Sequence, residues 1–162
     1  MNIEEFVSGF NKARDKHEYI VKNLKTDYLP YSVKCSESKK IVNAAMYETI
    51  DGERVFKYNK PSVYFLMVMA VFNNYFDIDC GERSWMEVFD ILEKNSIANE
   101  ISSIEDVISF NVVLNMTVED EISENTNMVM LINQKVSAFL KTWEASEKQL
   151  LPLMKKLSSG EE

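Results

Sequence analysis

Apolar residues recur at steps of three and four along most of the chain, the spacing of an amphipathic helix. The first such stretch, Ile3 to Leu24, is predicted to be one helix. Pro30 stops any continuation of that helix, and Ser32 is placed to cap the next one. The second helix is expected to carry three exposed lysines, which are Lys34, Lys39 and Lys40.

Strand-forming residues flank Asp51-Gly52, with Thr49 and Ile50 before it and Val55 and Phe56 after it. Asp-Gly between two such runs is the strongest short hairpin signal. The segment is therefore predicted to be a small β-hairpin, which must lean on helices because two short strands are not stable alone.

An unbroken apolar run from Val63 to Phe72 follows the predicted hairpin. It is too short for a membrane span, which needs about 20 apolar residues. Pro61 and a cap at Asn59 predict a helix that ends near Phe76. Because this helix is apolar on every side, it must be surrounded, and we expect the amphipathic segments on both sides of it in the sequence to cover it. The residues expected to be mostly buried are Tyr64, Leu66, Met67, Met69, Ala70 and Val71.

The remaining chain predicts further helices. Ser84 with Glu87 forms a capping-box pattern, and Ser103 with Asp106 indicates another capped start. An apolar segment that starts at Val107 is expected to end in the acidic stretch "EDEISEN". The last region, Met128 to Leu157, has six residues at helical spacing: Val129, Ile132, Val136, Phe139, Leu140 and Trp143.

These patterns predict a mainly α fold, a compact bundle of about six or seven helices around a central apolar helix, with one small β-hairpin. The 162 residues contain only 4 Gly and 3 Pro, which disfavours turn-rich β folds and disorder. We expect one helical domain over residues 1–157 and a frayed tail over 158–162.

Charge is uneven along the chain, whose formal net charge is −8. Residues 77–124 hold 13 acidic and 2 basic side chains, while the segments before and after are nearly balanced. Such a block repels nucleic acid and attracts basic partners, although solvated helix faces have the same composition. The candidate partner-binding residues are Asp77, Asp79, Glu82, Glu119, Asp120, Glu121 and Glu124.

No motif for catalysis, for a cofactor or for a metal is present. "DIDCGE" resembles the start of a calcium loop, but Glu82 stands where the loop needs glycine and Val88 where it needs glutamate. His17 is the single histidine, and Cys35 and Cys80 have no CxxC partner. We expect a cytoplasmic protein, not an enzyme, without cofactor, metal, direct nucleic-acid binding or membrane association.

The order of segments resembles a group of small proteins encoded by tailed bacteriophages and prophages of low-GC Gram-positive bacteria. The resemblance rests on "EEFVSGFNKARDKHEYIVKN", "YLPYSVKCSESKKIV", "NKPSVYFLMVMAVFNNYFDID", "VFDILEKN", "ISFNVVLNMTVEDE" and "LINQKVSAF". In that group a Tyr-Val-Pro-Tyr element stands where this chain has Leu29 before the proline. The resemblance implies phage origin and a helical fold, and it supplies no catalytic residue.

The sequence thus predicts a non-enzymatic phage protein that acts through protein–protein contacts in virion assembly or structure. The alternative is an inhibitor of a host defence protein that uses the acidic middle region, in the manner of a nucleic-acid mimic. The expected partner is a phage structural protein in the first case and a basic host protein in the second. Homo-oligomer formation is left open, because a second copy is able to cover an apolar helix as well as the chain itself.

Overall fold

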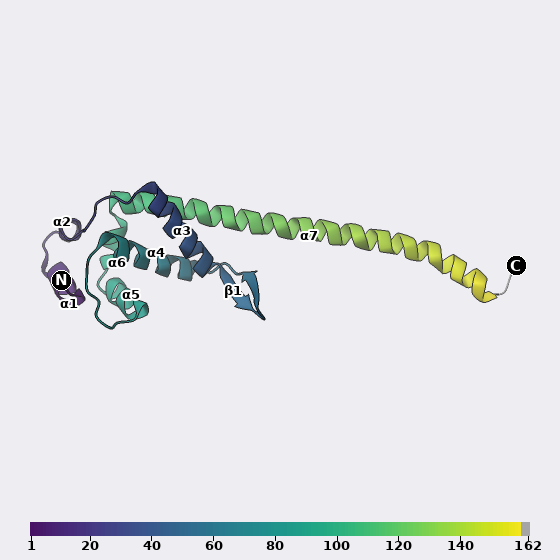
Figure 1. The fold of residues 1–162 in the computed structure, drawn as a ribbon, viewed down its shortest axis with the longest axis horizontal. Coiled ribbons are helices and arrows are strands. Elements are labelled where there is room, and N and C mark those ends of the chain that lie inside the picture. Colours follow the sequence, from purple (N-terminus) through teal and green to yellow (C-terminus); the bar gives the residue numbers. More distant parts are fainter. Residues whose placement is uncertain (160–162) are drawn as a thin grey trace. The chain divides into compact units, whose positions relative to one another are not determined.

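The computed structural model describes the backbone of residues 1–159 and the side chains of residues 1–143. Within that range it has seven helices and one two-stranded hairpin (Figure 1), which confirms the predicted mainly α class. The elements are α1 (Ile3–Lys12), α2 (Lys16–Lys22), α3 (Tyr31–Ala45), β1 (Tyr47–Ile50), β2 (Glu53–Phe56), α4 (Lys60–Tyr75), α5 (Trp85–Lys94), α6 (Ile97–Ser102) and α7 (Glu105–Ser159). The predicted frayed tail over 158–162 includes residues 160–162, which lie outside the described chain.

The chain divides into two compact units, with the boundary inside α7. The first unit, Met1–Glu121, contains all of the hairpin, helices α1 to α6 and the first part of α7. The second unit begins at Ile122, and its described backbone is helical throughout.

The predicted first helix is in fact two helices, so the prediction of one helix from Ile3 to Leu24 was wrong. The break falls at Ala13, whose backbone is extended. The Ala13 N–H donates to the Gly9 and Phe10 carbonyls, and α1 ends there. Asp15 then caps α2, because its Oδ1 accepts a hydrogen bond from the Glu18 N–H at 2.9 Å. This side-chain cap favours a new helix start over continuation.

The start of α3 also differs from the prediction. The helix begins at Tyr31 directly after Pro30, and no side chain caps it, so the predicted cap at Ser32 was wrong. Pro30 is itself the N-cap residue, with φ of −55° and ψ of 142°, and its backbone carbonyl accepts from the Val33 and Lys34 N–H groups at 2.9 and 3.1 Å.

The predicted hairpin is confirmed, with β1 antiparallel to β2 and Tyr47 opposite Phe56. Asp51 and Gly52 form the turn with φ of 52° and 83°, the two positive values that a type I′ turn requires. The Tyr47 ring packs edge-on against Phe56, and its hydroxyl donates to Glu121 on α7. The hairpin therefore contacts a helix, as expected because an isolated pair of short strands is not stable in water.

Gly52→Ala is expected to weaken the hairpin by about 1 kcal/mol, because an L side chain at positive φ is strained. The built Cβ would meet no atom within 4 Å, so the cost is conformational and not steric. Amide hydrogen exchange of the two strands, followed by NMR, should quicken about fivefold. Gly52→Asn is the control, since asparagine tolerates this conformation better, and equal exchange in Gly52→Ala and wild type would contradict the assignment.

Helix α4 forms as predicted, from Lys60 after a cap in which Asn59 Oδ1 accepts from the Ser62 N–H at 3.2 Å. It lies beside α3 (Figure 1) and buries much of its surface. Its buried residues are Met67, Val68, Met69, Val71, Phe72 and Tyr75, while Leu66 and Ala70 are half-buried. Burial of Tyr64 was predicted wrongly: it is 39% exposed, with its hydroxyl donating to Glu93 at 2.7 Å.

Helix α5 has the predicted capping box of Ser84 and Glu87. Ser103, by contrast, ends α6 instead of capping α7, since its hydroxyl donates back to the Glu100 carbonyl at 2.7 Å. α7 then continues from Glu105 without a break through "EDEISEN", where the sequence had predicted a helix end. Glutamate is a good helix former, so an acidic stretch without Gly or Pro does not stop a helix.

Candidate functional site

The acidic residues predicted to bind a partner fall into separate groups. Asp77, Asp79 and Glu82 are exposed in the connection between α4 and α5. The backbone of Asp79 pairs with the N-terminal segment, accepting from the Ile3 N–H and donating to the Met1 carbonyl, both at 3.0 Å. This loop is therefore held at the start of α1.

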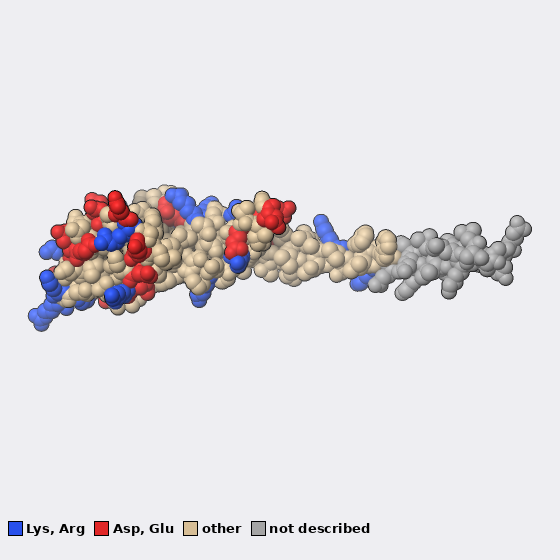
Figure 2. Space-filling model, turned by 90° about the horizontal axis from the view of Figure 1, so that it is seen from below, with Lys and Arg blue, Asp and Glu red and all other residues tan. Residues whose placement is uncertain are grey.

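The other four acids lie on α7. Glu119 and Asp120 are exposed, whereas Glu121 is half-buried and accepts a hydrogen bond from the Tyr47 hydroxyl. Glu124 is exposed and belongs to the second unit. The structure thus places the loop acids and the helix acids on different elements, and Figure 2 shows acidic side chains in several places with basic ones among them.

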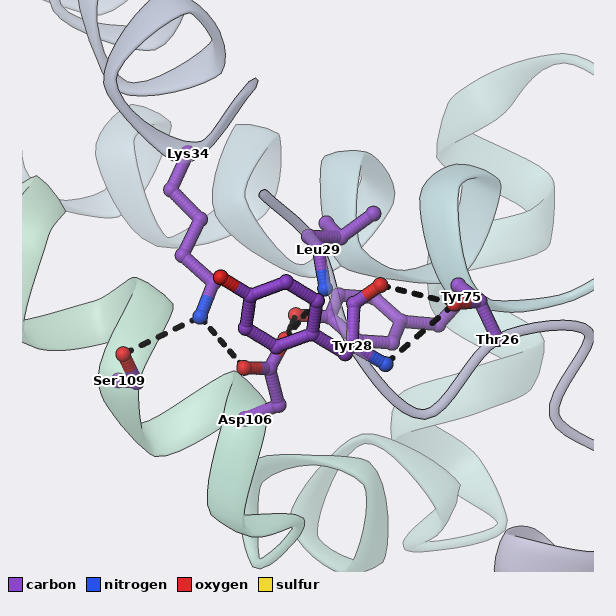
Figure 3. Close-up of polar contacts among 7 residues, drawn as sticks. All are labelled: Thr26, Tyr28, Leu29, Lys34, Tyr75, Asp106 and Ser109. Atoms are coloured by element: carbon purple, nitrogen blue, oxygen red, sulfur yellow. Dashed lines mark hydrogen bonds and ion pairs between the residues drawn. The ribbon is translucent and has the colours of Figure 1, made fainter. Parts of the chain in front are cut away.

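A buried ion pair lies at the junction of α3, α4 and α7 (Figure 3). Lys34 Nζ lies 2.5 Å from Asp106 Oδ1 and donates to Ser109 Oγ at 3.1 Å. The second carboxylate oxygen of Asp106 accepts from the Tyr75 hydroxyl at 2.5 Å and from the Leu29 N–H at 2.8 Å. The side chains of Lys34 and Asp106 are only 3% and 12% exposed. One carboxylate therefore joins three helices and the segment before α3.

Two opposing effects act on the pKa of Asp106. Burial raises it, but hydrogen bonds from Lys34, Tyr75 and the Leu29 N–H together outweigh burial and hold the pKa below its usual value. Burial and the adjacent carboxylate raise the pKa of Tyr75, so its hydroxyl stays protonated and able to donate. Asp106 is thus a stably ionised structural carboxylate, and its hydrogen bonds are already filled by the protein.

Sequence reasoning missed this cluster because it predicted Lys34 to be exposed, which was wrong. The buried residues of α3 are Lys34, Ser38, Ile41, Val42 and Ala45, so the lysine occupies a position on the apolar stripe. The sequence did contain a signal of this burial, because Lys34 stands at helical spacing from the apolar residues of the same helix. Its partner is 72 positions away, and nothing local in the sequence indicates which acid that is.

The strongest candidate for function is an exposed apolar face on the second unit. Nine large apolar side chains between residues 128 and 143 are each more than half exposed. They are Met128, Val129, Met130, Leu131, Ile132, Val136, Phe139, Leu140 and Trp143. All of them except Met130 and Leu131 lie on one side of the helix by their spacing, and these seven form the apolar face. The sequence predicted the helical spacing of six of these residues but not that the helix would be left uncovered. Soluble monomers rarely expose contiguous apolar surface on this scale, so this surface is a candidate interaction site.

Other chemical features are sparse in the described part of the chain. No three His, Cys, Asp or Glu side chains among residues 1–143 are grouped so as to hold a metal ion. Cys35 and Cys80 are both free thiols and half-buried. No helix among the described residues is long and apolar enough to cross a bilayer.

Comparison with known proteins adds no further assignment. No protein-family model, curated protein or solved structure matches the chain. The exposed helix face and the buried ion pair are therefore interpreted from their own geometry.

Proposed function

We propose that this is a non-enzymatic protein of a tailed phage that acts by protein–protein interaction in virion assembly or structure. It would work in the cytoplasm of the host cell or in the virion itself. The single observation that carries the proposal is the apolar face of α7 between Met128 and Trp143. The phage setting rests on the sequence resemblance alone.

The size of this face supports binding over an incidental surface feature. Each side chain of the face is 51–64% exposed, and covering that apolar surface contributes about 25 cal/mol per Å² before the cost of association is subtracted. A lone apolar side chain on a surface needs no explanation, but seven on one side of a helix within sixteen residues do. Binding to another protein removes this surface from water.

The test compares phage that encode the wild-type chain, a face variant and a control variant. Ile132→Gln with Phe139→Gln removes two apolar side chains from the face, whereas Met130→Gln with Leu131→Gln removes two similarly exposed ones that lie outside the face by helical spacing. Mass spectrometry of purified virions and of pulldowns from infected cells should find the wild-type chain and the control with a phage structural protein at fixed ratio. The face variant should lose that protein and lower the yield of intact virions.

Two results would count against the proposal. One is the absence of any phage partner for the wild-type chain in both virions and infected cells. The other is a partner retained equally by the face variant, which would move the interaction away from this helix.

The alternative function is inhibition of a host defence protein through the acidic middle region. It is favoured by the exposure of Asp77, Asp79, Glu82, Glu119 and Asp120, because exposed carboxylates attract a basic partner. Such a complex should weaken steeply as salt rises, while a complex made through the apolar face should not. Replacing the five carboxylates by amides would separate the two functions, since only the inhibitor would lose its partner.

A further inference from the structure

The apolar face has a regular repeat that indicates what covers it. From Ile122 the positions 122, 125, 129, 132, 136, 139 and 143 follow one another at alternating steps of three and four. This is the heptad repeat of a coiled coil. The first position of each heptad holds Ile122, Val129, Val136 and Trp143, and the fourth holds Asn125, Ile132 and Phe139.

We infer that this face binds a second copy of the same chain, forming a parallel two-stranded coiled coil from Ile122 to Trp143. The inference deepens the proposed function and rests on it in one respect, namely that the face of α7 exists to bind protein. It assigns this face to a second copy, so that a phage structural protein binds the dimer and is lost from the face variant because the dimer is lost. A straight α-helix has 3.6 residues per turn, so a seam repeating every 3.5 residues stays in contact only when two helices supercoil around each other.

The residue types in the seam favour two parallel strands. β-Branched residues occupy three of the four first positions, at Ile122, Val129 and Val136, as they do in parallel dimers, although the fourth positions hold no leucine. Asn125 is the single polar residue among the seven seam positions. In a parallel pair in register, Asn125 faces Asn125 of the other copy and the two amides are able to hydrogen-bond, whereas in an antiparallel pair each amide would face apolar residues.

The positions beside the seam are compatible with a second copy in parallel. Residues 125–143 contain only two charged side chains, Lys135 and Lys141, both positive. In a parallel pair the flanking position of Lys135 faces Leu140 of the other copy, so the lysine stem is able to cover apolar surface without meeting a like charge. Met128 and Leu140 occupy flanking positions and widen the apolar seam. Identical helices therefore meet without charge repulsion.

The available area matches what a stable dimer needs. Seven side chains lie on or beside the seam, and each is 51–64% exposed: Met128, Val129, Ile132, Val136, Phe139, Leu140 and Trp143. Each of these side chains has on the order of 100 Å² of surface that a partner is able to cover, so the face offers roughly 700 Å² per copy. A standard stable interface covers roughly 800 Å² per partner, so one helix of a second copy suffices.

The oligomeric state of the purified full-length chain tests the inference. Sedimentation equilibrium at micromolar concentration should give twice the chain mass of 18.8 kDa for the wild-type protein. Ile132→Gln with Phe139→Gln should raise the dimer Kd at least 100-fold and give the single-chain mass. The matched control, Met130→Gln with Leu131→Gln, should remain dimeric because these side chains lie outside the seam. Circular dichroism of each variant establishes that the first unit remains folded.

Strand direction is tested by disulfide formation between copies. In a background of Cys35→Ser and Cys80→Ser, Ile122→Cys places one thiol at the beginning of the seam. Two parallel helices in register bring the two thiols together, so mild oxidation should give a covalent dimer. Antiparallel helices would hold them at opposite ends of the seam, and failure to cross-link in a protein that is still dimeric would overturn the parallel arrangement.

A wild-type chain that sediments as a monomer, or as a trimer or larger, would overturn the inference. So would equal dissociation of the face variant and the control. The outcomes are distinct from those for the proposed function. A monomer that captures a phage structural protein through this face contradicts only the dimer, whereas a dimer with no phage partner in infected cells contradicts the proposed function.

Discussion

Asp106→Ala is expected to lower the free energy of unfolding of the first unit by about 3–5 kcal/mol. The substitution leaves the Lys34 ammonium, which is 3% exposed, without its carboxylate. It also leaves the Tyr75 hydroxyl and the Leu29 N–H without the oxygen to which both now donate. An uncompensated buried charge costs far more than an exposed one, because water cannot replace the lost partner. Urea unfolding followed by circular dichroism at fixed protein concentration measures the loss.

The ion pair of Lys40 with the partly exposed Glu37, both on α3, supplies a control. Lys40 is 68% exposed, so Glu37→Ala should cost less than about 1 kcal/mol. Lys34→Met combined with Asp106→Asn removes both charges and keeps an oxygen for Tyr75 and Leu29. This double variant should recover more than half of the loss seen in Asp106→Ala. If Asp106→Ala cost no more than Glu37→Ala, the buried pair would have no structural importance.

The same carboxylate gives the unit an acid-sensitive stability. The pKa of Asp106 is lower in the folded state than in the unfolded chain, where it is about 3.9. Its contribution is therefore fully present above the unfolded pKa and is lost as pH falls through the folded pKa. In wild type the loss should begin near pH 4 and deepen below it. Asp106→Asn should be less stable at neutral pH and should lack this component of the acid dependence.

The elements that the sequence predicted well are those set by neighbouring residues. The turn at Asp51-Gly52, the cap at Asn59 and the capping box of Ser84 all depend on contacts within three positions, and all form as predicted. The break between α1 and α2 has a local signal of the same kind. Asp15 three residues before Glu18 is a cap pattern, but it lies inside a continuous apolar periodicity that indicated one helix.

The features that were predicted wrongly depend on distant contacts. Lys34 is buried because Asp106 and Ser109 meet it from α7, and a hydrophobicity pattern counts every lysine as exposed. Tyr64 lies in the central apolar run near the start of α4, where its contacts with Phe89 and Glu93 on α5 leave it 39% exposed. Periodicity predicts which residues share a face, but which face is covered depends on packing between elements.

The apolar face of α7 is the clearest case in which periodicity does not predict whether a face is covered. The spacing of Val129, Ile132 and Val136 predicts an apolar face, and the same spacing serves a face buried inside a domain. Only the structure distinguishes the two cases, because it leaves these side chains more than half exposed. The candidate acidic residues were also not located by the sequence pattern. They form one charged block in the sequence but separate groups on a loop and on a helix in the structure.

Phe6→Ala is the second substitution from which a large effect is expected, a loss of about 3–5 kcal/mol in the free energy of unfolding. Phe6 is 0% exposed, and its ring lies 5.7 Å from those of Tyr19 and Phe76 and 6.3 Å from that of Phe72, between ring centroids. Removing it opens a cavity at the point where α1 packs against α2 and α4. The surrounding aromatic rings are held by their own helices and cannot close the gap fully, so the cavity adds to the lost burial.

Two variants determine whether the cavity causes the loss of stability. Phe6→Leu keeps much of the side-chain volume and should cost roughly 1–2 kcal/mol. Val21→Ala removes apolar atoms from a side chain of α2 that is 46% exposed, and it should cost less than about 1 kcal/mol. Thermal and urea unfolding should therefore rank the variants Val21→Ala, Phe6→Leu and Phe6→Ala in order of increasing loss. Equal losses for Phe6→Ala and Val21→Ala would mean that α1 is not anchored by this ring, and that the backbone pairing of Ile3 with Asp79 holds the N-terminal segment instead.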